Sequence, residues 1–341
     1  MKLQTRSEIV SLLRGQVACP VLANLAELGW LERMSESCFS CATFPEAEPA
    51  TTNSVFKYLA ALGLLVERCE AAGHYVASDL GRKVFARHGS FCILNSYQNF
   101  FQDLTSLLLV SNLGGKPVVN RFRNVLGSGQ LHSRKFFSPA LQMLAGRSFP
   151  FLVDLGCGNG QFLQQAIELK LARKLGGVDV SHVAVTATAT KVGGARACVC
   201  LHAVEADAYV VSIWSKKLPW YKEAGLFSLW FVLHEFSRSD PRVVLRFLRE
   251  INSRYPSAEL ILGELVKLPD HALANNRTES IMPEFLFFHE LSGQGVLSWP
   301  EWQEIRRTMP FQVVTERYLD SILVEDGTTL PSSFIWHLKP F

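Results

Sequence analysis

The sequence has little charge and no concentration of either sign. Only 19% of its 341 residues are charged, and 34 basic against 31 acidic residues give a formal net charge of +3. Surfaces that bind nucleic acid need clusters of Lys and Arg, and the chain has no basic run. We therefore expect no nucleic-acid partner. Since 48% of the residues are hydrophobic, the composition also excludes a disordered chain.

The sequence also lacks an uninterrupted apolar run of the roughly 18 residues that a membrane span needs. Charged residues break the apolar positions of the N-terminal stretch, which is not typical of a signal peptide. The eight cysteines are spread thinly, and only Cys38 and Cys41 have a C-x-x-C spacing. Thiols stay reduced in chains that are not exported. We therefore expect a soluble cytoplasmic protein with free cysteines and no membrane partner.

The apolar pattern divides the chain into three parts. Residues 1–90 contain helices followed by two short strands around Gly73, which is the order of a winged-helix domain. Residues 91–149 form a helical connector, expected to roof a substrate pocket. It ends in GSGQLHSRKFF (127–137), whose glycines predict a loop and a helix start. From residue 150 onward, short apolar strands alternate with helices, which predicts a mainly parallel α/β sheet with an antiparallel last pair.

The most informative motif is VDLGCGNG (153–160), which ends a strand and opens a helix. Glycines let the backbone approach a ligand closely. Asp179, followed by Val180, ends the next strand, where an acid accepts hydrogen bonds from ribose hydroxyls. A dinucleotide site needs a further glycine at position 161, which is Gln161. Asp154 would repel phosphates and suits the cationic end of S-adenosylmethionine, so that cofactor is favoured.

The string VDLGCGNG resembles the first motif of class I S-adenosylmethionine-dependent methyltransferases. With its N-terminal domain, the chain resembles small-molecule methyltransferases that dimerise through a winged helix. The resemblance implies a Rossmann-like seven-stranded sheet in 150–341, an N-terminal mainly α winged-helix domain and a homodimer. It further implies that Asp154, Gly156 and Gly158 line the methionine end of the cofactor, that Asp179 binds the ribose and that Asp207 binds the adenine amino group.

Two His-Glu pairs are candidates for the chemistry. His234-Glu235 follows an apolar strand expected over 226–233, and ligands of open α/β sheets bind beyond the carboxyl ends of strands. His289-Glu290 lies on a strongly apolar segment, where a buried imidazole needs a polar partner. Two neutral imidazoles that converge on one pocket can bind a transition metal such as iron. Spacing alone does not show whether they converge.

The segments FVLHEF, FLFFHELSGQG and GSGQLHSRKFF resemble those of bacterial α-keto acid C-methyltransferases. These enzymes methylate the β-carbon of phenylpyruvate or 2-ketoarginine in specialised amino-acid metabolism. The resemblance implies a non-haem iron, or another divalent metal, held by His234 and His289 and chelated by the keto acid, which stabilises an enolate. Glu264 or Glu235 would then orient His234. The chain lacks the second catalytic acid of O-methyltransferases, because Gly293–Ser298 stands in its place.

The substrate contacts stay open at this level. Arg121, Arg123 or Arg134 can hold a substrate carboxylate, since a guanidinium binds it in a bidentate manner. Phe285 would suit an arylpyruvate, whereas Glu284 would suit a guanidino group.

Two other hypotheses compete with α-keto acid C-methylation. The first is metal-independent O-, N- or indole C-methylation with His234 as the general base. The second is a DNA-binding regulator whose methyltransferase half only senses S-adenosylmethionine, and the weak basicity of residues 50–65 argues against it.

Overall fold

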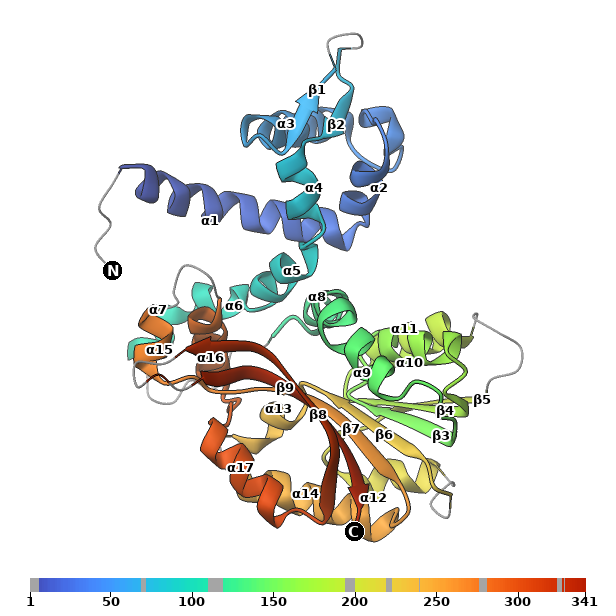
Figure 1. Ribbon diagram of the computed structural model, residues 1–341. Coiled ribbons are helices and arrows are strands. Elements are labelled where there is room, and N and C mark those ends of the chain that lie inside the picture. The colour runs from blue at the N-terminus through green and yellow to red at the C-terminus, as the bar shows by residue number, and fades with distance from the viewer. Residues whose placement is uncertain are drawn as a thin grey trace. The chain divides into compact units, whose positions relative to one another are not determined.

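The computed structural model describes residues 6–68, 72–109, 119–193, 200–218, 223–238, 240–275, 281–323, 327 and 329–341 (Figure 1). The chain forms two compact units. Unit 1 comprises Met1–Gln98 and Asn120–Leu131, and unit 2 comprises Asn99–Val119 and His132–Phe341. The segment expected as a connector, 91–149, thus contributes to both units.

Unit 1 is built of helices and a two-stranded wing. Its elements are α1 (Arg6–Glu27), α2 (Trp30–Glu36), a 3-10 turn (Cys41–Thr43), α3 (Pro49–Ala61), β1 (Leu65–Glu67), β2 (Tyr75–Ala77), α4 (Asp79–Phe85), α5 (His88–Ser96) and α8 (Arg121–His132). As predicted, two antiparallel strands follow a helix. The rings of Phe39, Phe44, Phe56 and Tyr75 pack against one another in the core of this unit.

The glycines of 127–137 lie in a helix, so the predicted loop was wrong. α8 runs through Gly127 and Gly129, and a π-helix continues it over Ser133–Phe137. A Cβ atom on Gly127 would lie 2.5 Å from the carbonyl oxygen of Gly89 in α5. The missing side chain therefore lets two helices approach closely, which is the second use of glycine beside the tight turn.

Helix α1 carries an apolar face that is exposed to solvent. Ile9, Leu12, Leu13 and Val17 are each about half exposed or more, and their spacing places them on one side of the helix. Over Ile9–Glu27 this helix is also long and apolar enough, by length and composition, to cross a membrane. A single helix of this kind near an N-terminus is weak evidence for a membrane span.

Unit 2 contains the mainly parallel sheet that the sequence pattern predicts, with the seven strands that the resemblance to methyltransferases implies. Its strands are β3 (Phe149–Leu155), β4 (Ala172–Asp179), β5 (Cys200–Glu205), β6 (Leu226–Trp230), β7 (Glu259–Leu265), β8 (Phe311–Leu323) and β9 (Thr329–Pro340). They are arranged in the order β5-β4-β3-β6-β7-β9-β8, with the first five parallel and the last two antiparallel. For the strand that corresponds to β5, the sequence pattern predicts the range 197–201, and residues 194–199 lie outside the described residues.

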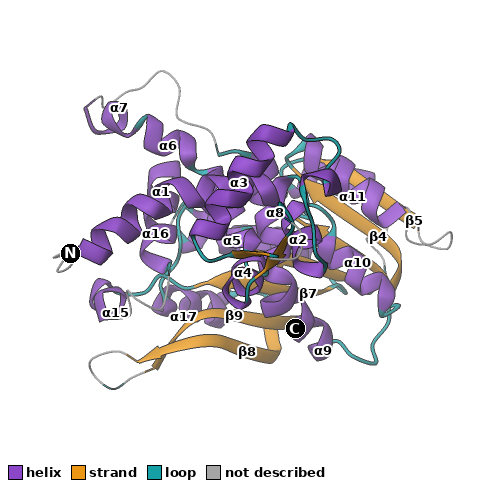
Figure 2. Cartoon of the chain, turned by 90° about the horizontal axis from the view of Figure 1, so that it is seen from above, coloured by secondary structure: helices purple, strands orange, loops and turns teal. Residues whose placement is uncertain are grey.

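Unit 2 also contains helices, several of which cover its sheet. They are α6 (Gln98–Gln102), α7 (Leu104–Leu109), α9 (Ser138–Met143), α10 (Gln161–Glu168), α11 (His182–Gly193), α12 (Val211–Trp214), a 3-10 turn (Ser215–Lys217), α13 (Leu233–Ser237), α14 (Pro241–Arg254), α15 (Asp270–Asn275), α16 (Met282–Ser292) and α17 (Trp299–Thr308). Helices α10 and α11 lie beside β4 and β5 at one end of the sheet, and β8 and β9 form the other end (Figure 2).

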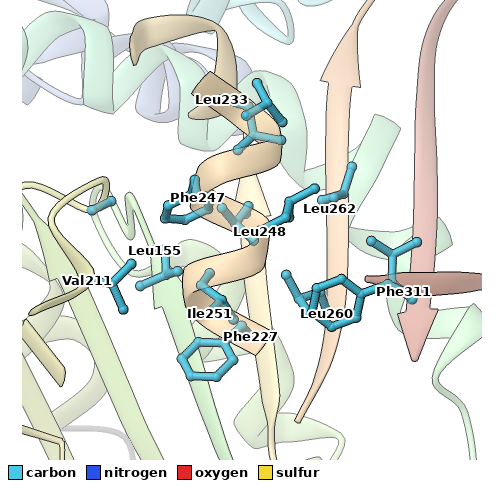
Figure 3. Packing of buried hydrophobic residues seen from close by; sticks show 14 of the residues in the cluster. Leu155, Val211, Phe227, Leu233, Phe247, Leu248, Ile251, Leu260, Leu262 and Phe311 are labelled. Atoms are coloured by element: carbon cyan, nitrogen blue, oxygen red, sulfur yellow. The ribbon is translucent and has the colours of Figure 1, made fainter. Parts of the chain in front are cut away.

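Both faces of the sheet are buried. Phe151, Val153 and Leu155 of β3 belong to one apolar cluster, whereas Leu152 of the same strand belongs to the cluster on the opposite face. On the first face, α14 packs Phe247, Leu248 and Ile251 against β6 and β7 (Figure 3). Because both faces are covered at the centre of the sheet, β3 and β6 are largely apolar runs without polar alternation. The edge strand β8 is mostly exposed and contains polar residues. This apolar packing holds the strands in place, and with them the carboxyl ends that carry the polar residues of the candidate site.

Candidate active site

The parallel strands bring the predicted site residues to one edge of the sheet. β3 pairs on one side with β4 and on the other with β6, so the chain reverses its winding direction between β3 and β6. Open α/β sheets bind ligands beyond the carboxyl ends of the strands at such a switch point. Five strand ends contribute to this edge: the glycine loop follows β3, Asp179 ends β4, Asp207 follows β5, His234 follows β6 and Glu264 lies near the end of β7.

The glycine loop has a backbone that side chains rarely permit. Gly156, Gly158 and Gly160 have φ values of +78°, +53° and +73°, which lie in the left-handed region favoured by glycine. A Cβ atom on Gly156 would also lie 2.3 Å from Cγ2 of Val232, which follows β6. The loop therefore lies directly against the segment that leads to His234, and α10 begins immediately after Gly160.

Asp179 is joined to the glycine loop. Its Oδ2 accepts a hydrogen bond from the backbone N–H of Gly158 at 3.0 Å, and its Oδ1 accepts one from Ser181 at 2.9 Å. Both oxygens are thus oriented by backbone donors at the ends of two neighbouring strands. This fixed carboxylate is of the kind that accepts hydrogen bonds from ribose hydroxyls.

Asp154 is the second buried acid next to this loop. It is only 2% exposed, and its Oδ1 accepts a hydrogen bond from Ser228 Oγ at 2.6 Å. The net pKa of Asp154 is raised to about 7, mainly by burial and also by the charge of Asp179, while the Ser228 hydrogen bond opposes both. A ligand cation beside it would lower this pKa, because an opposite charge favours the carboxylate. Ser228 carries no motif, so the sequence did not reveal this partner.

Val180 and Asp207 are exposed at the same edge. Val180 is 57% exposed, and Oδ1 of Asp207 accepts a hydrogen bond from the backbone N–H of Tyr209 at 2.9 Å. Between them, His182 Nδ1 pairs with Glu205 Oε2 at 2.9 Å and so links the ends of β4 and β5. The ribose and adenine roles of these residues stay predictions.

His234 is held by a buried carboxylate. β6 ends at Trp230 rather than at 233, because Phe231 has a φ of +58° and turns the chain into α13. Glu264 accepts hydrogen bonds from Leu233 N at 2.8 Å and from His234 Nδ1 at 3.0 Å. A carboxylate only accepts, so the proton lies on Nδ1 of His234. Burial lowers the pKa of His234, but the Glu264 carboxylate outweighs it, and the net shift is upward.

His289 converges with His234. The centroids of the two rings are 4.8 Å apart with an angle of 71° between their planes. His289 Nδ1 donates to the carbonyl oxygen of Phe285 at 2.6 Å, so this nitrogen also carries its proton. Burial and the nearby His234 charge lower the pKa of His289 to about 3, which leaves its ring neutral. The structure thus shows that His234 and His289 lie close together, which their spacing in the sequence could not show.

The two glutamates that follow these histidines differ in position. Glu235 is partly buried on α13, and its charge also raises the pKa of His234. Glu290 is exposed and pairs with Lys267 at 3.6 Å. The structure therefore assigns the direct contact with His234 to Glu264, while the orienting role predicted for Glu235 stays a prediction.

The three arginines predicted to bind the substrate belong to different units of the structure. Arg121 and Arg123 belong to unit 1, whereas the histidines belong to unit 2, so a role for either in substrate binding stays a prediction. Arg123 Nε already pairs with Glu27 at 2.8 Å. The side chain of Arg134 lies outside the described residues.

His234 and His289 are the candidate protein ligands for a metal ion. In the described part of the chain, no group of three or more His, Cys, Asp or Glu side chains is arranged to hold one. The two histidines nevertheless fit a partial site, because each Nδ1 is bonded to an acceptor, as is usual for metal-binding imidazoles. Substrate and solvent would have to supply the remaining ligands.

No protein-family model and no curated protein sequence matches the chain. Solved structures match it over nearly its whole length. One is the mitomycin 7-O-methyltransferase MmcR, which is 14% identical over 98% of this chain and 97% of that chain, with a TM-score of 0.59. A putative O-methyltransferase from Nostoc punctiforme is 12% identical over 98% and 99%, with a TM-score of 0.60. PigF, solved with SAH, is 14% identical over 99% and 100%, with a TM-score of 0.59. The chain therefore has the class I methyltransferase fold with an N-terminal helical domain.

Proposed function

We propose that the protein is an S-adenosylmethionine-dependent methyltransferase that acts on a small molecule. Both the geometry of the site and the overall fold support this proposal. The glycine loop and Asp179 lie at the switch point of the sheet and are joined by a hydrogen bond. Asp154 adds a buried acid next to them. PigF, which has the same fold, was solved with SAH, the demethylated product of this cofactor. His234 follows β6, which is adjacent to the strand that carries the loop.

The methyl acceptor in this proposal is the β-carbon of an α-keto acid. The observation that carries it is the convergence of His234 and His289, whose rings are 4.8 Å apart. In both rings Nδ1 is engaged by an acceptor, so Nε2 is the atom that can bind a metal. The ring of His289 is neutral, as a metal ligand must be. The Glu264 carboxylate raises the pKa of His234, so protons compete more strongly with a metal at this residue.

A divalent metal such as iron, held by His234 and His289, would act as a Lewis acid toward the keto and carboxylate oxygens of the substrate. The residues of the chain would contribute by positioning the reacting groups. Glu264 fixes the ring of His234 through Nδ1, and the glycine loop holds the methyl donor on the neighbouring strand. Loss of the β-proton then makes the carbon nucleophilic, and it attacks the sulfonium methyl in line.

The substrate side chain in this proposal is apolar and planar. Glu284 and Glu290 are both exposed, whereas His289 on the same helix is buried, so these acids do not share its face. Phe285 does share it, with its ring 3.7 Å from that of His289 and 6.0 Å from that of His234. An aryl group would pack against this ring. A guanidino group would find no acid on that face of α16.

Replacing His289 by Ala should separate metal binding from cofactor binding. We expect the wild-type protein to retain about one metal ion per chain and to methylate arylpyruvates, and EDTA to abolish this activity. His289→Ala should lose the metal and at least about tenfold in rate, because a remaining single imidazole binds weakly. It should bind S-adenosylhomocysteine as the wild type does. Elemental analysis, calorimetry and a methylation assay measure these quantities.

A matched control is His271→Ala, which removes an exposed histidine of α15. It should change neither metal content nor rate. Full activity of the metal-free protein, together with an unaffected His289→Ala variant, would contradict the metal-dependent mechanism.

That second outcome would favour metal-independent O- or N-methylation. The His234–Glu264 pair supports this alternative, because a carboxylate that orients an imidazole is also the arrangement of a general base. MmcR, which has the same fold, is an O-methyltransferase. Assays with hydroxyl and amine acceptors in the presence of EDTA test it.

We also propose that the chain forms a homodimer through α1. Ile9, Leu12, Leu13 and Val17 expose an apolar face on this helix, and a second copy of the same face would cover it. Leu13→Lys should therefore shift the protein toward the monomer in analytical ultracentrifugation. Leu169→Lys, at a residue of unit 2 that is 57% exposed, is the control and should leave the dimer intact. Equal sedimentation of both variants and the wild type would contradict the proposal.

A further inference from the structure

A third histidine is held at the carboxyl end of β6. His132, the last residue of α8, belongs to unit 2, and its ring stacks on Phe231 of the same unit with centroids 3.9 Å apart and an interplanar angle of 24°. Phe136 and Phe137 meet the same ring edge-on at 5.6 and 6.2 Å. Phe231 directly follows β6 and precedes His234 by three residues. The imidazole of His132 is therefore fixed beside the segment that carries the catalytic histidine.

Ser133, the residue after His132, connects this imidazole to the helix that follows the glycine loop. Ser133 Oγ accepts a hydrogen bond from Gln165 Nε2 at 2.6 Å. Gln165 lies on α10, the helix that begins at the glycine loop. His132 is thus attached to the cofactor helix through Ser133 and to the β6 end through Phe231. Those are the two elements that hold the methyl donor and the methyl acceptor in the proposed function.

The ring of His132 has no hydrogen-bond partner among the residues that the structure describes. The side chain is partly exposed and its ring nitrogens are not enclosed by protein, so they are accessible to a ligand. Burial, together with the charges of His234 and Lys135, lowers the pKa of His132 to about 3, so the free ring is neutral. A neutral imidazole offers one nitrogen that accepts a proton and one that donates a hydrogen bond. The accessible accepting nitrogen of this ring is therefore open to a proton from a bound substrate.

We infer that His132 is the catalytic base that removes the β-proton of the α-keto acid, and this inference rests on the proposed function. The β C–H bond breaks, its proton moves to the unprotonated nitrogen of His132, and its electron pair remains in the enolate. The β-carbon then forms a bond to the methyl group, while the S–CH3 bond breaks and its electron pair stays on sulfur. The products are the β-methylated keto acid, S-adenosylhomocysteine and the imidazolium of His132.

The other two histidines are less suited to this step. In the proposed function the Nε2 atoms of His234 and His289 hold the metal, and both Nδ1 atoms already donate to acceptors. The aromatic stack on Phe231 keeps the ring in place during the transfer.

The test follows deuterium exchange at the β-carbon of phenylpyruvate in D2O by NMR, with metal and S-adenosylhomocysteine present so that no methyl transfer occurs. The wild type should accelerate exchange above the rate without enzyme. His132→Phe keeps the stack on Phe231 and His132→Gln keeps polarity, and both should lose about 100-fold of the enzymatic exchange and methylation rates. Both should retain metal and S-adenosylhomocysteine, and His271→Gln should exchange normally.

The outcomes of this experiment distinguish a failure of the role inferred for His132 from a failure of the proposed function. Undiminished exchange in both well-folded His132 variants, as judged by circular dichroism, would overturn the role of His132 and leave the proposed function standing. A wild-type protein that binds S-adenosylhomocysteine but neither exchanges nor methylates any α-keto acid would overturn the proposed function itself. Loss of exchange with intact metal and cofactor binding would establish His132 as the base.

Discussion

Replacing His234 by Gln should lower kcat/KM by about 10³-fold, whichever of the two mechanisms operates. A general base in a methyltransferase site contributes about 10²–10⁴-fold, and a metal site built from two imidazoles does not survive the loss of one. Glutamine has a similar size and preserves a polar group at a position that is 5% exposed. The fold and the cofactor site should therefore persist. Steady-state kinetics with the best acceptor, and calorimetry with S-adenosylhomocysteine, measure the two effects separately.

A second variant changes Glu264, the carboxylate that accepts a hydrogen bond from His234, and should have a smaller effect. Glu264→Gln keeps the acceptor oxygen but removes the charge that raises the pKa of His234. We expect a loss of about 10–100-fold, the usual cost of an altered partner of a functional histidine. Glu290→Gln changes an exposed carboxylate near the other histidine and should be neutral. A His234→Gln variant that keeps more than a tenth of wild-type activity would remove this residue from the mechanism.

The sheet and its cofactor edge could be predicted from the sequence because local signals specify them. The apolar runs at 151–153 and 226–230 are continuous since both faces of the sheet are buried. Three glycines after the first run predict a left-handed turn, and all three have positive φ. The acid at 179 follows from the next strand end. Parallel strands with helical connections then fix the edge at which these residues meet.

The proposed catalytic side of the site could not be predicted in the same way, because it depends on contacts between distant segments. Nothing near His234 in the sequence indicates that Glu264 accepts from its Nδ1 at 3.0 Å. His132 lies in a segment whose glycines suggested a loop, but these glycines serve helix packing against Gly89. Glycine alone does not distinguish a turn from a close helix contact. Only the three-dimensional arrangement places the imidazole of His132 on Phe231.

Gly156→Ala should weaken binding of S-adenosylhomocysteine by more than about 100-fold. Two penalties act at this position. The φ of +78° costs a residue with a Cβ atom about 1–2 kcal/mol. The new Cβ would lie 2.3 Å from Cγ2 of Val232, a stiff β-branched side chain, which adds about 1–3 kcal/mol of overpacking. Relief of this clash displaces the loop and the segment before His234, so cofactor affinity and activity should fall together.

Gly146→Ala separates the two penalties. Gly146 has nearly the same φ, +76°, but a Cβ atom there would meet nothing within 4 Å. This variant should lose only the backbone part of the free energy of unfolding, about 1–2 kcal/mol, and should bind S-adenosylhomocysteine as the wild type does. Denaturant unfolding and calorimetry on both variants measure the difference. If the two variants bound the ligand equally well, close approach of the loop to Val232 would not determine the cofactor site, and its position at the β3–β6 switch point would need another explanation.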